Sequence, residues 1–509
     1  MGQSTLVAGF VGFLFISYLI QRLVSSSKNR GHPLPPGPKG LPIVGNINDL
    51  PKPGALEAHH WLKHKDLYGP LSSVTVMGQT IIIINDPDMA IELLEKRSAK
   101  HSSRPGMVFI GEMVGWEHGT GGAPYNERFR VHRKHISRII GSKTTAAQYN
   151  KMQEAEAGHF LLHLLEKPDD FVDHIKREAG SLILKIVYGY TAEPFERDPF
   201  VDMVGEAMDN FSEGAIPGAF HVYSVRLRRV PPSSLFADTS KVRYVPSWFP
   251  GTGWQQTAKQ WRDQLVETRE KPYAFVEQQV AQGKDSTSFL ARLIGLGDST
   301  PAERFEWKWA AVSLYGGGAD TTVSSIACFF LAMTLFPEVQ RKAQEEIDRV
   351  VGSDRLPTVN DRENLPYIEA VVKEVMRWHP VGPMGLPHSS TEDDVYEGYF
   401  IPKDAMLFPN IWFVFGFGRR ICPGRILAES SLYINIAQAL SVYSITKPVF
   451  DGKLVEPAVK FTSGVVSHPE PFKTSIKPRS AHHEQLIRSI VETYPWEPSD
   501  AKTLESLKF

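Results

Sequence analysis

The stretch that decides the fold of this 509-residue chain is FGFGRRICPGR, at positions 415–425. It places Cys422 among closely spaced glycines and next to the cations Arg419 and Arg420, ahead of an apolar helical pattern over 425–443. Cations and a helix N-terminus favour thiolate over thiol, and glycines let the backbone pass close to a flat ligand. An inert buried thiol is the ordinary alternative for a lone cysteine, but these neighbours favour a thiolate able to ligate iron.

Composition sets the class of the chain. Charge is nearly balanced, with 56 Lys and Arg against 57 Asp and Glu, and 42% of the residues are hydrophobic. These values are typical of a globular protein with a large core and give no reason to expect a nucleic-acid partner. The only two cysteines, Cys328 and Cys422, argue against a disulfide framework and suit a cytosol-facing protein.

The N-terminal region carries an uncharged run, LVAGFVGFLFISYLI at 6–20, followed by basic residues up to Arg30. A membrane span needs about 20 apolar residues and at least about 17, which the run reaches only with its apolar neighbours. A cleaved signal peptide is the alternative, although no basic residue precedes the run and no A-x-A site follows it. The basic flank favours a cytoplasmic body. We therefore expect a membrane anchor at 1–24 and a stiff, proline-rich hinge at 25–46.

The rest of the chain, 47–509, is expected to form a mainly α domain with a small β component. Residues 71–86 have the pattern of a β-hairpin, because two β-branched runs flank a turn at Met77-Gly78-Gln79. Helical periodicity dominates after this hairpin. The predicted helices include 89–97, 145–167, 307–336, 337–351, 367–379 and 425–443.

A second glycine-rich stretch, YGGGADTTVSS at 315–325, lies inside the apolar run 309–336. A second membrane span is the alternative interpretation of that run, but its polar centre argues against it. Each glycine inside a helix costs about 1 kcal/mol relative to alanine. Three in succession therefore predict a local opening of the helix where another group approaches the backbone. Asp320 and Thr321 place a carboxylate and a hydroxyl at this predicted opening.

The pattern Phe-x-x-Gly-x-Arg-x-Cys-x-Gly at 415–424 resembles the cysteine-loop signature of the cytochrome P-450 family. The resemblance implies a cytochrome P-450 fold that binds haem b, with Cys422 as the axial thiolate ligand of the iron. It assigns four further residues of the loop to cofactor binding, namely Phe415, Gly418, Arg420 and Gly424. Arg420 is implied to contact a haem propionate.

Other motifs follow in the family's order along the chain. The stretch 317–322 resembles the family's oxygen-activation motif, which implies that Thr321 hydrogen-bonds the bound oxygen molecule and that Asp320 relays protons from solvent. Glu374 and Arg377 resemble the family's Glu-x-x-Arg pair behind the haem, although such an i,i+3 pair alone is worth only about 0.2–0.5 kcal/mol.

Two further propionate contacts are implied by resemblance. His388 belongs to a Leu-Pro-His stretch that supplies one of them. Arg133 belongs to a segment in which the family has a Trp four residues earlier, whereas this chain has Phe129. Because Phe has no indole N–H to donate, that contact is expected to be absent. A solvated helix charge is the alternative interpretation of Arg133.

The implied activity is a monooxygenase that inserts one oxygen atom of O2 into an apolar small molecule. It would take electrons from NADPH through an NADPH-cytochrome P-450 reductase, at the endoplasmic reticulum membrane with its catalytic domain on the cytosolic face. Two stretches, 242–251 and HPEPF at 468–472, resemble fungal O-methylsterigmatocystin oxidoreductase-like members, which implies secondary metabolism or detoxification. A haem-thiolate isomerase or dehydratase is disfavoured by the Asp320-Thr321 pair, whereas a non-catalytic membrane protein with defective haem binding stays open.

Two places depart from the family pattern. Between Trp412 and Phe415 the family carries a few dozen more residues, including an arginine that completes a network with Glu374 and Arg377. The shortened chain is expected to leave that buried pair partly unsatisfied. Residues 221–240 look like an insertion, either retained intron sequence or a basic, apolar loop touching the membrane.

We expect the messenger RNA to contain in-frame coding sequence between codons 412 and 415 that is missing from this chain, because the family pattern is interrupted there. Sequencing the transcript measures this directly and decides the origin of 221–240 in the same reads. An uninterrupted message that encodes this chain unchanged would contradict the prediction.

Overall fold

The computed structural model describes residues 31–42, 44–52, 54–215, 248, 252–411 and 413–507. Several sequence-based expectations lie outside these residues: the anchor at 1–24, the start of the hinge, the insertion at 221–240, all but one residue of the motif at 242–251, and Trp412.

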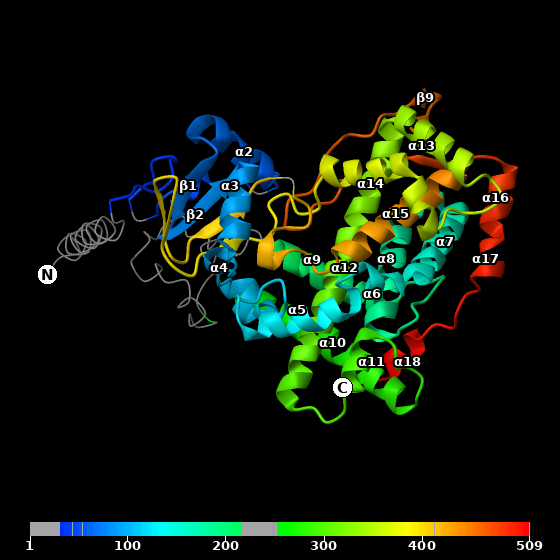
Figure 1. The fold of residues 1–509 in the computed structure, drawn as a ribbon, viewed down its shortest axis with the longest axis horizontal. Helices are drawn as coiled ribbons and strands as arrows, with labels where there is room; N and C mark the ends of the chain where they lie inside the picture. The colour runs from blue at the N-terminus through cyan, green and yellow to red at the C-terminus, as the bar shows by residue number, and fades with distance from the viewer. Residues whose placement is uncertain are drawn as a thin grey trace.

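Helices form most of the described chain, and a small β-region lies at one side of the helical body, as expected for a mainly α protein (Figure 1). The α-helices are α2 (Glu57–Tyr68), α3 (Pro87–Ile91), α4 (Ser98–His101), α5 (Glu127–Ile140), α6 (Lys143–Ala147), α7 (Asn150–Glu166), α8 (Phe171–Tyr188), α9 (Pro199–Gly214), α10 (Gly253–Ala281), α11 (Phe289–Ile294), α12 (Pro301–Leu335), α13 (Pro337–Val350), α14 (Pro366–Trp378), α15 (Arg425–Val442), α16 (Ala481–Arg488), α17 (Ile490–Thr493) and α18 (Ala501–Ser506).

The main sheet has the strand order β1-β2-β6-β3 and joins segments far apart in the chain. Its strands are β1 (Leu71–Val76), β2 (Gln79–Ile84), β6 (Met406–Pro409) and β3 (His388–Ser389). β2 pairs antiparallel with β1 and parallel with β6, and β6 pairs antiparallel with β3. Two-stranded sheets complete the β structure: β4 (Asp394–Tyr396) with β5 (Tyr399–Ile401), β7 (Tyr443–Thr446) with β10 (Ser475–Pro478), and β8 (Val449–Phe450) with β9 (Lys453–Leu454).

The predicted hairpin at 71–86 is confirmed, with Val76 paired to Gln79 across the turn. Both turn residues have positive φ, 50° at Met77 and 87° at Gly78. Such a two-residue turn matches the right-handed twist of the flanking strands. Gly78 takes this conformation without strain, while Met77 is a non-glycine residue held there by the hairpin.

Helix α12 runs through the centre of the helical body (Figure 1). Its start is fixed by a capping box in which Thr300 and Glu303 bond reciprocally, with Pro301 in the first turn. Within the described residues it is the one helix long and apolar enough to cross a membrane, but 72% of that apolar stretch is buried inside the protein. The argument against a second span is thus supported by packing.

The predicted helices are confirmed with small differences at their ends. The expected helix at 145–167 is two helices, α6 and α7, because the chain breaks at Gln148 and Tyr149. The expected helix at 89–97 is α3 followed by a π-helical turn at Glu92–Lys96. The boundary between α12 and α13 falls at Phe336, just before Pro337, which has no N–H to continue the helix.

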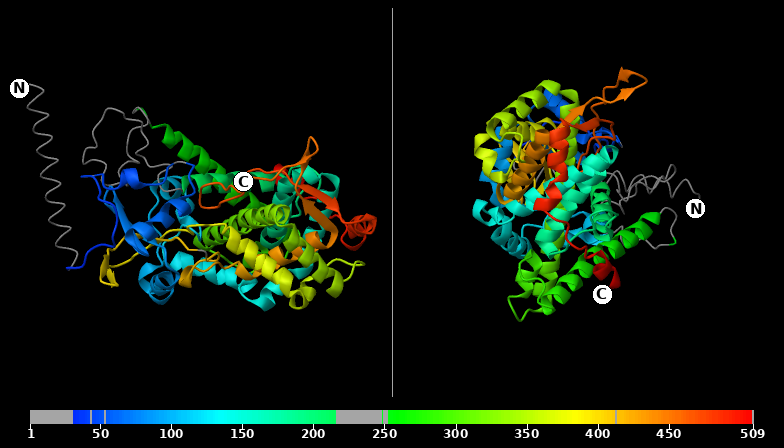
Figure 2. Two further views of the ribbon diagram at one scale, coloured as in Figure 1. Left: turned by 90° about the horizontal axis from the view of Figure 1, so that it is seen from above. Right: turned by 90° about the vertical axis from the view of Figure 1, so that its right-hand side faces the viewer.

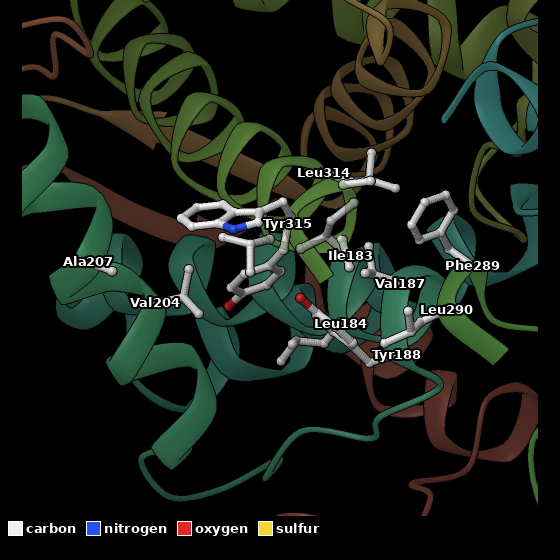
Figure 3. Packing of buried hydrophobic residues seen from close by; sticks show 14 of the residues in the cluster. Ile183, Leu184, Val187, Tyr188, Val204, Ala207, Phe289, Leu290, Leu314 and Tyr315 are labelled. Atoms are coloured by element: carbon white, nitrogen blue, oxygen red, sulfur yellow. The ribbon is translucent and has the colours of Figure 1, made fainter. Parts of the chain in front are cut away.

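Two apolar clusters share α12 as their common wall. One joins α8, α9, α10 and α11 to its N-terminal half, and Figure 3 shows Tyr188, Val204 and Tyr315 close together there, with Leu290 beside Val187. The other joins α7, α8, α13, α14 and α15 to its C-terminal half. The β8–β9 hairpin projects from the body, while α16 and α17 lie along one side near α7 (Figure 2).

A polar group interrupts the second cluster. Glu178 on α8 is 3% exposed, and one of its oxygens accepts a hydrogen bond of 2.8 Å from Asn435 Nδ2 on α15. Its other oxygen, Oε2, has no hydrogen-bond partner among the described residues. Burial raises the pKa of Glu178 to about 8, and the nearby Glu156 carboxylate adds to that rise.

We expect Glu178→Gln to stabilise the protein at pH 8 by roughly 2–4 kcal/mol and to change little at pH 4.5. Because the pKa is raised in the folded state, the stability that Glu178 provides is complete below about pH 4.5 and is lost as the pH rises towards 8. Denaturant unfolding across this pH range measures the effect, with the exposed Glu166→Gln at the end of α7 as control. A pH-independent effect of Glu178→Gln would contradict the pKa assignment.

Candidate active site

A cavity of about 390 Å³ lies between α12, the cysteine loop and the start of α15. Its lining is mostly apolar and includes Thr321 on α12 and Cys422 in the loop. Cys422 retains accessible surface although it lies deep in the protein, since that surface faces the cavity. The structure therefore brings the two main sequence motifs to one cavity.

The cysteine loop is held by its own backbone and by its neighbours. The Cys422 N–H donates to the Phe415 carbonyl at 2.8 Å, and both residues line the cavity. Gly418 does not line it within the described residues: its φ is +49°, and a Cβ there would lie 2.5 Å from the Leu94 carbonyl oxygen. Gly418 thus permits close contact with protein backbone, whereas Gly424 lines the cavity next to the sulfur.

The environment of the thiol differs in part from the expected one. The pKa of Cys422 is raised overall, because burial outweighs the N–H groups of Gly424 and Arg425 at the start of α15 and the charge of Arg133, which lower it. The expected helix N-terminus is therefore in place. The expected cations are not: Arg420 bonds backbone carbonyls, Arg419 stacks over a tyrosine ring, and Arg133 with Arg425 acts on the sulfur instead.

Two guanidinium groups, those of the buried Arg420 and the half-buried Arg104, form a second feature of the cavity wall. Arg420 donates to the carbonyls of Ser102 and Ala123, both at 2.7 Å, and stacks 3.9 Å over the Phe129 ring. Arg104 donates to the carbonyls of Gly121, Leu386 and Pro387 at 2.8–3.0 Å. Burial lowers the pKa of both groups, that of Arg420 to about 10.

The cavity is consequently electropositive. Arg133 lines it as a third cation, with Nη1 2.5 Å from the Ile421 carbonyl oxygen, and none of the described lining residues carries a carboxylate. Buried charges without a counter-ion are costly. The residues present therefore fit an anionic group such as the two propionates of haem. Arg104 was missed by sequence reasoning because no local motif surrounds it.

His388 also lines the cavity, on β3. Its Nδ1 lies 2.7 Å from the carbonyl oxygen of His101, and burial with the charge of Arg104 lowers its pKa well below the usual range. The ring is therefore neutral, donates to His101 and leaves Nε2 as an acceptor. An anion bound in the cavity would favour the imidazolium, which donates from both nitrogens.

The α12 glycines do not open the helix as predicted, because α12 is continuous from Pro301 to Leu335. Gly316 and Gly318 instead make room for neighbours: a Cβ would lie 2.6 Å from Met208 Sδ and 2.9 Å from Ile183 Cδ1. Gly317 lines the cavity with no atom in the way of a Cβ. Thr321 lines it too, and its hydroxyl donates to the Gly317 carbonyl at 2.7 Å.

Three predicted residues lie away from the cavity lining. Asp320 pairs with His468 at 3.1 Å. Glu374 and Arg377 pair with each other at 2.7 Å on α14, and their side chains are 58% and 52% exposed. The expected buried pair is thus wrong for this chain. The pairing with Arg377 lowers the pKa of Glu374.

The fold, the thiol and the electropositive cavity define a helical haem-thiolate protein. The family model for cytochrome P-450 matches residues 35–226 and 233–414, so the chain belongs to the cytochrome P-450 family. The match skips 227–232, inside the expected insertion, and stops at 414, just before the cysteine loop.

Named monooxygenases of this family are similar to the chain over nearly its whole length. Cytochrome P-450 monooxygenase ppsD of Aspergillus oryzae is 44% identical, with 93% of this chain and 94% of the relative covered. Cytochrome P-450 monooxygenase claR of Ampulloclitocybe clavipes is 41% identical, with 97% and 93% covered. O-methylsterigmatocystin oxidoreductase of Aspergillus flavus is 37% identical, with 96% of each covered. The chain is therefore a haem monooxygenase of this family, and the predicted likeness to the last relative is confirmed.

We expect Arg104→Met to speed loss of haem about ten- to hundred-fold, because a charge-assisted hydrogen bond is worth about 1.5–3 kcal/mol. Transfer of haem to apomyoglobin measures the rate, and Arg349→Met, exposed on α13, is the matched control. Equal haem loss in both variants would contradict the anion-binding role.

Proposed function

We propose that this chain inserts one oxygen atom of O2 into an apolar small molecule in fungal secondary metabolism or detoxification. The observation that carries the proposal is the single cavity lined by both Cys422 and Thr321. Haem held there would supply oxygen activation, promoted by electron donation from an axial thiolate. Cys422 would be the ligand.

The propionates would be held by the buried cations. Arg104 and Arg420 donate hydrogen bonds to backbone carbonyls, which are neutral. Both groups therefore keep their positive charge, and both line the cavity. Arg133 and His388 line the same space and complete the set. These four groups come from different parts of the chain. They would therefore orient the haem as well as balance the negative charge of its propionates.

The substrate would lie against the apolar side of the cavity. The side chains that form this surface come from α9, α12 and the segment before β10, and they include Met208, Phe211, Val312, Val465 and Val466. Such a lining excludes water and offers few polar groups for orientation, which suits an apolar molecule. On α12 the Thr321 hydroxyl would hold a proton at the cavity and Asp320, one residue earlier, would supply it.

Electrons would come from NADPH through an NADPH-cytochrome P-450 reductase. The apolar run at 6–20 would anchor the chain in the endoplasmic reticulum membrane, with the catalytic domain on the cytosolic face. The reductase is proposed from the family to which the chain belongs, and the membrane anchor from the apolar run and its basic flank.

A non-catalytic chain is the second candidate, and the exposure of the Glu374–Arg377 pair favours it. Phe413, at the junction, is also 45% exposed. The alignment with the ppsD protein is 516 positions long but takes in only 93% of the chain's 509 residues, so several tens of positions are filled by the relative alone. These observations support a missing segment between 412 and 415 that would cover this surface and steady the cysteine loop.

We expect the dithionite-reduced, full-length protein to give the carbon monoxide difference band typical of a thiolate-bound haem, and Cys422→Ser to lose it. Haem content per protein, measured in parallel, separates lost thiolate ligation from lost haem. A wild-type chain that binds no haem, or gives only the shorter-wavelength form, would support the non-catalytic candidate. A thiolate band that survives Cys422→Ser would contradict the assignment of the ligand.

A further inference from the structure

The HPEPF motif at 468–472 has no role in the site described so far, although it lies directly against α12. The segment is fixed at both ends. Pro469 forms an isolated β-bridge with Phe461, and the Phe472 ring packs against Phe171 on α8 with ring centroids 5.3 Å apart. His468 is therefore presented by an anchored backbone.

Two contacts join this segment to the turn of α12 that carries the oxygen-activation motif. Ser324 Oγ donates to the Ser467 carbonyl at 2.6 Å, and His468 Nε2 lies 3.1 Å from Asp320 Oδ1. Asp320 and Ser324 are four residues apart and so lie on one face of the helix. Ser467 and His468 thus contact two successive turns of α12, and these contacts keep the imidazole next to the Asp320 carboxylate.

The pair connects the interior with solvent. The His468 side chain is 29% exposed and that of Asp320 is 19% exposed. Asp320 precedes Thr321, which lines the cavity, and Val466 on the His468 segment lines it as well. Both side chains of the pair therefore keep contact with water, and the carboxylate is one residue from the cavity-lining Thr321.

Other charged groups lie near the pair. Asp209 on α9 has a pKa raised by burial and by the Asp320 charge, and Lys176 on α8, His468 and Glu206 also act on it. Asp320 therefore interacts with a second carboxylate as well as with the imidazole. Among these groups, His468 is the one in direct contact with Asp320, and an imidazole can both accept and donate a proton near neutral pH.

We propose that His468 is a positioning and proton-relay residue that holds the Asp320 carboxylate in place and delivers protons to it. Nδ1 of the neutral imidazole takes a proton from solvent while Nε2 gives its proton to the Asp320 carboxylate, so one proton enters the ring, one leaves it, and no electron moves in this step. The inference rests on the proposed proton role of Asp320. It adds a donor from the C-terminal segment, which also forms part of the cavity wall.

The test compares His468→Gln with Ser324→Ala. Glutamine keeps a hydrogen bond to Asp320 but cannot relay a proton, whereas Ser324→Ala removes the other contact of the same segment and no titratable group. With holoenzyme, reductase and NADPH, we expect His468→Gln to slow NADPH consumption at least five-fold at pH 7. We also expect a larger solvent isotope effect, which is the ratio of the rates in ordinary and heavy water. Ser324→Ala should stay within two-fold of the wild type. A wild-type rate for His468→Gln overturns the relay.

A double-mutant cycle separates this inference from the function beneath it. His468→Gln should have no further effect on the rate in an Asp320→Asn background, because both changes interrupt one path. If the effects of His468→Gln and Asp320→Asn on the rate simply add in the double variant, the proposal is overturned. If Asp320→Asn alone has no effect although the carbon monoxide band is normal, the proton role of Asp320 fails; if the band is absent, the proposed function itself fails.

A readout without turnover tests the contact itself. In histidine-labelled protein in its ferrous carbon monoxide form, the Nε2 resonance lost in His468→Gln identifies His468. We expect this resonance to move in Asp320→Asn and to stay in place in Ser324→Ala. An unmoved resonance in Asp320→Asn shows that the two side chains do not interact and overturns the proposal.

Discussion

Positive charge buried without a carboxylate partner is the constraint on which the site depends. The guanidinium groups of Arg104 and Arg420 are held by backbone carbonyls from the segments around residues 102–123 and 386–387. Carbonyl dipoles orient these groups but do not neutralise them, so each keeps a net charge that faces the cavity. Such an arrangement is stable only if an anion completes it or if the surrounding fold compensates its cost. The segments around the sheet and the cysteine loop therefore all contribute to binding one anionic ligand.

Helix α12 connects that site to the rest of the molecule. Its two halves are buried in two different apolar clusters, which fixes its position along and about its own axis. Met208 and Ile183 pack closely onto Gly316 and Gly318, and this turn of α12, with Gly317 and Thr321, lines the cavity. The glycines act through helix packing rather than through an opened helix. The contact between His468 and Asp320 adds a third attachment, from the end of the chain.

The surface around α14 carries an exposed ion pair where the family pattern, with its longer connection between 412 and 415, implies a buried one. Glu374 and Arg377 form an ion pair on α14, and both side chains stay more than half exposed. A pair of this kind in water contributes little to stability. The cysteine loop nevertheless keeps its internal hydrogen bonds and its packing against Leu94.

The sequence by itself determined the elements and the chemistry that depend on local order. Periodicity placed the hairpin at 71–86 and the helices around α12 to α15, because period and turn residues act within a few positions. The cysteine-loop motif likewise identified the family. Tertiary structure alone decided which charges meet the cavity. Arg104 carries no local signal, Arg420 points to distant carbonyls rather than to the thiol, and His468 meets Asp320 across 148 positions of the chain. Each of these contacts depends on packing between segments far apart in sequence, which no local pattern encodes.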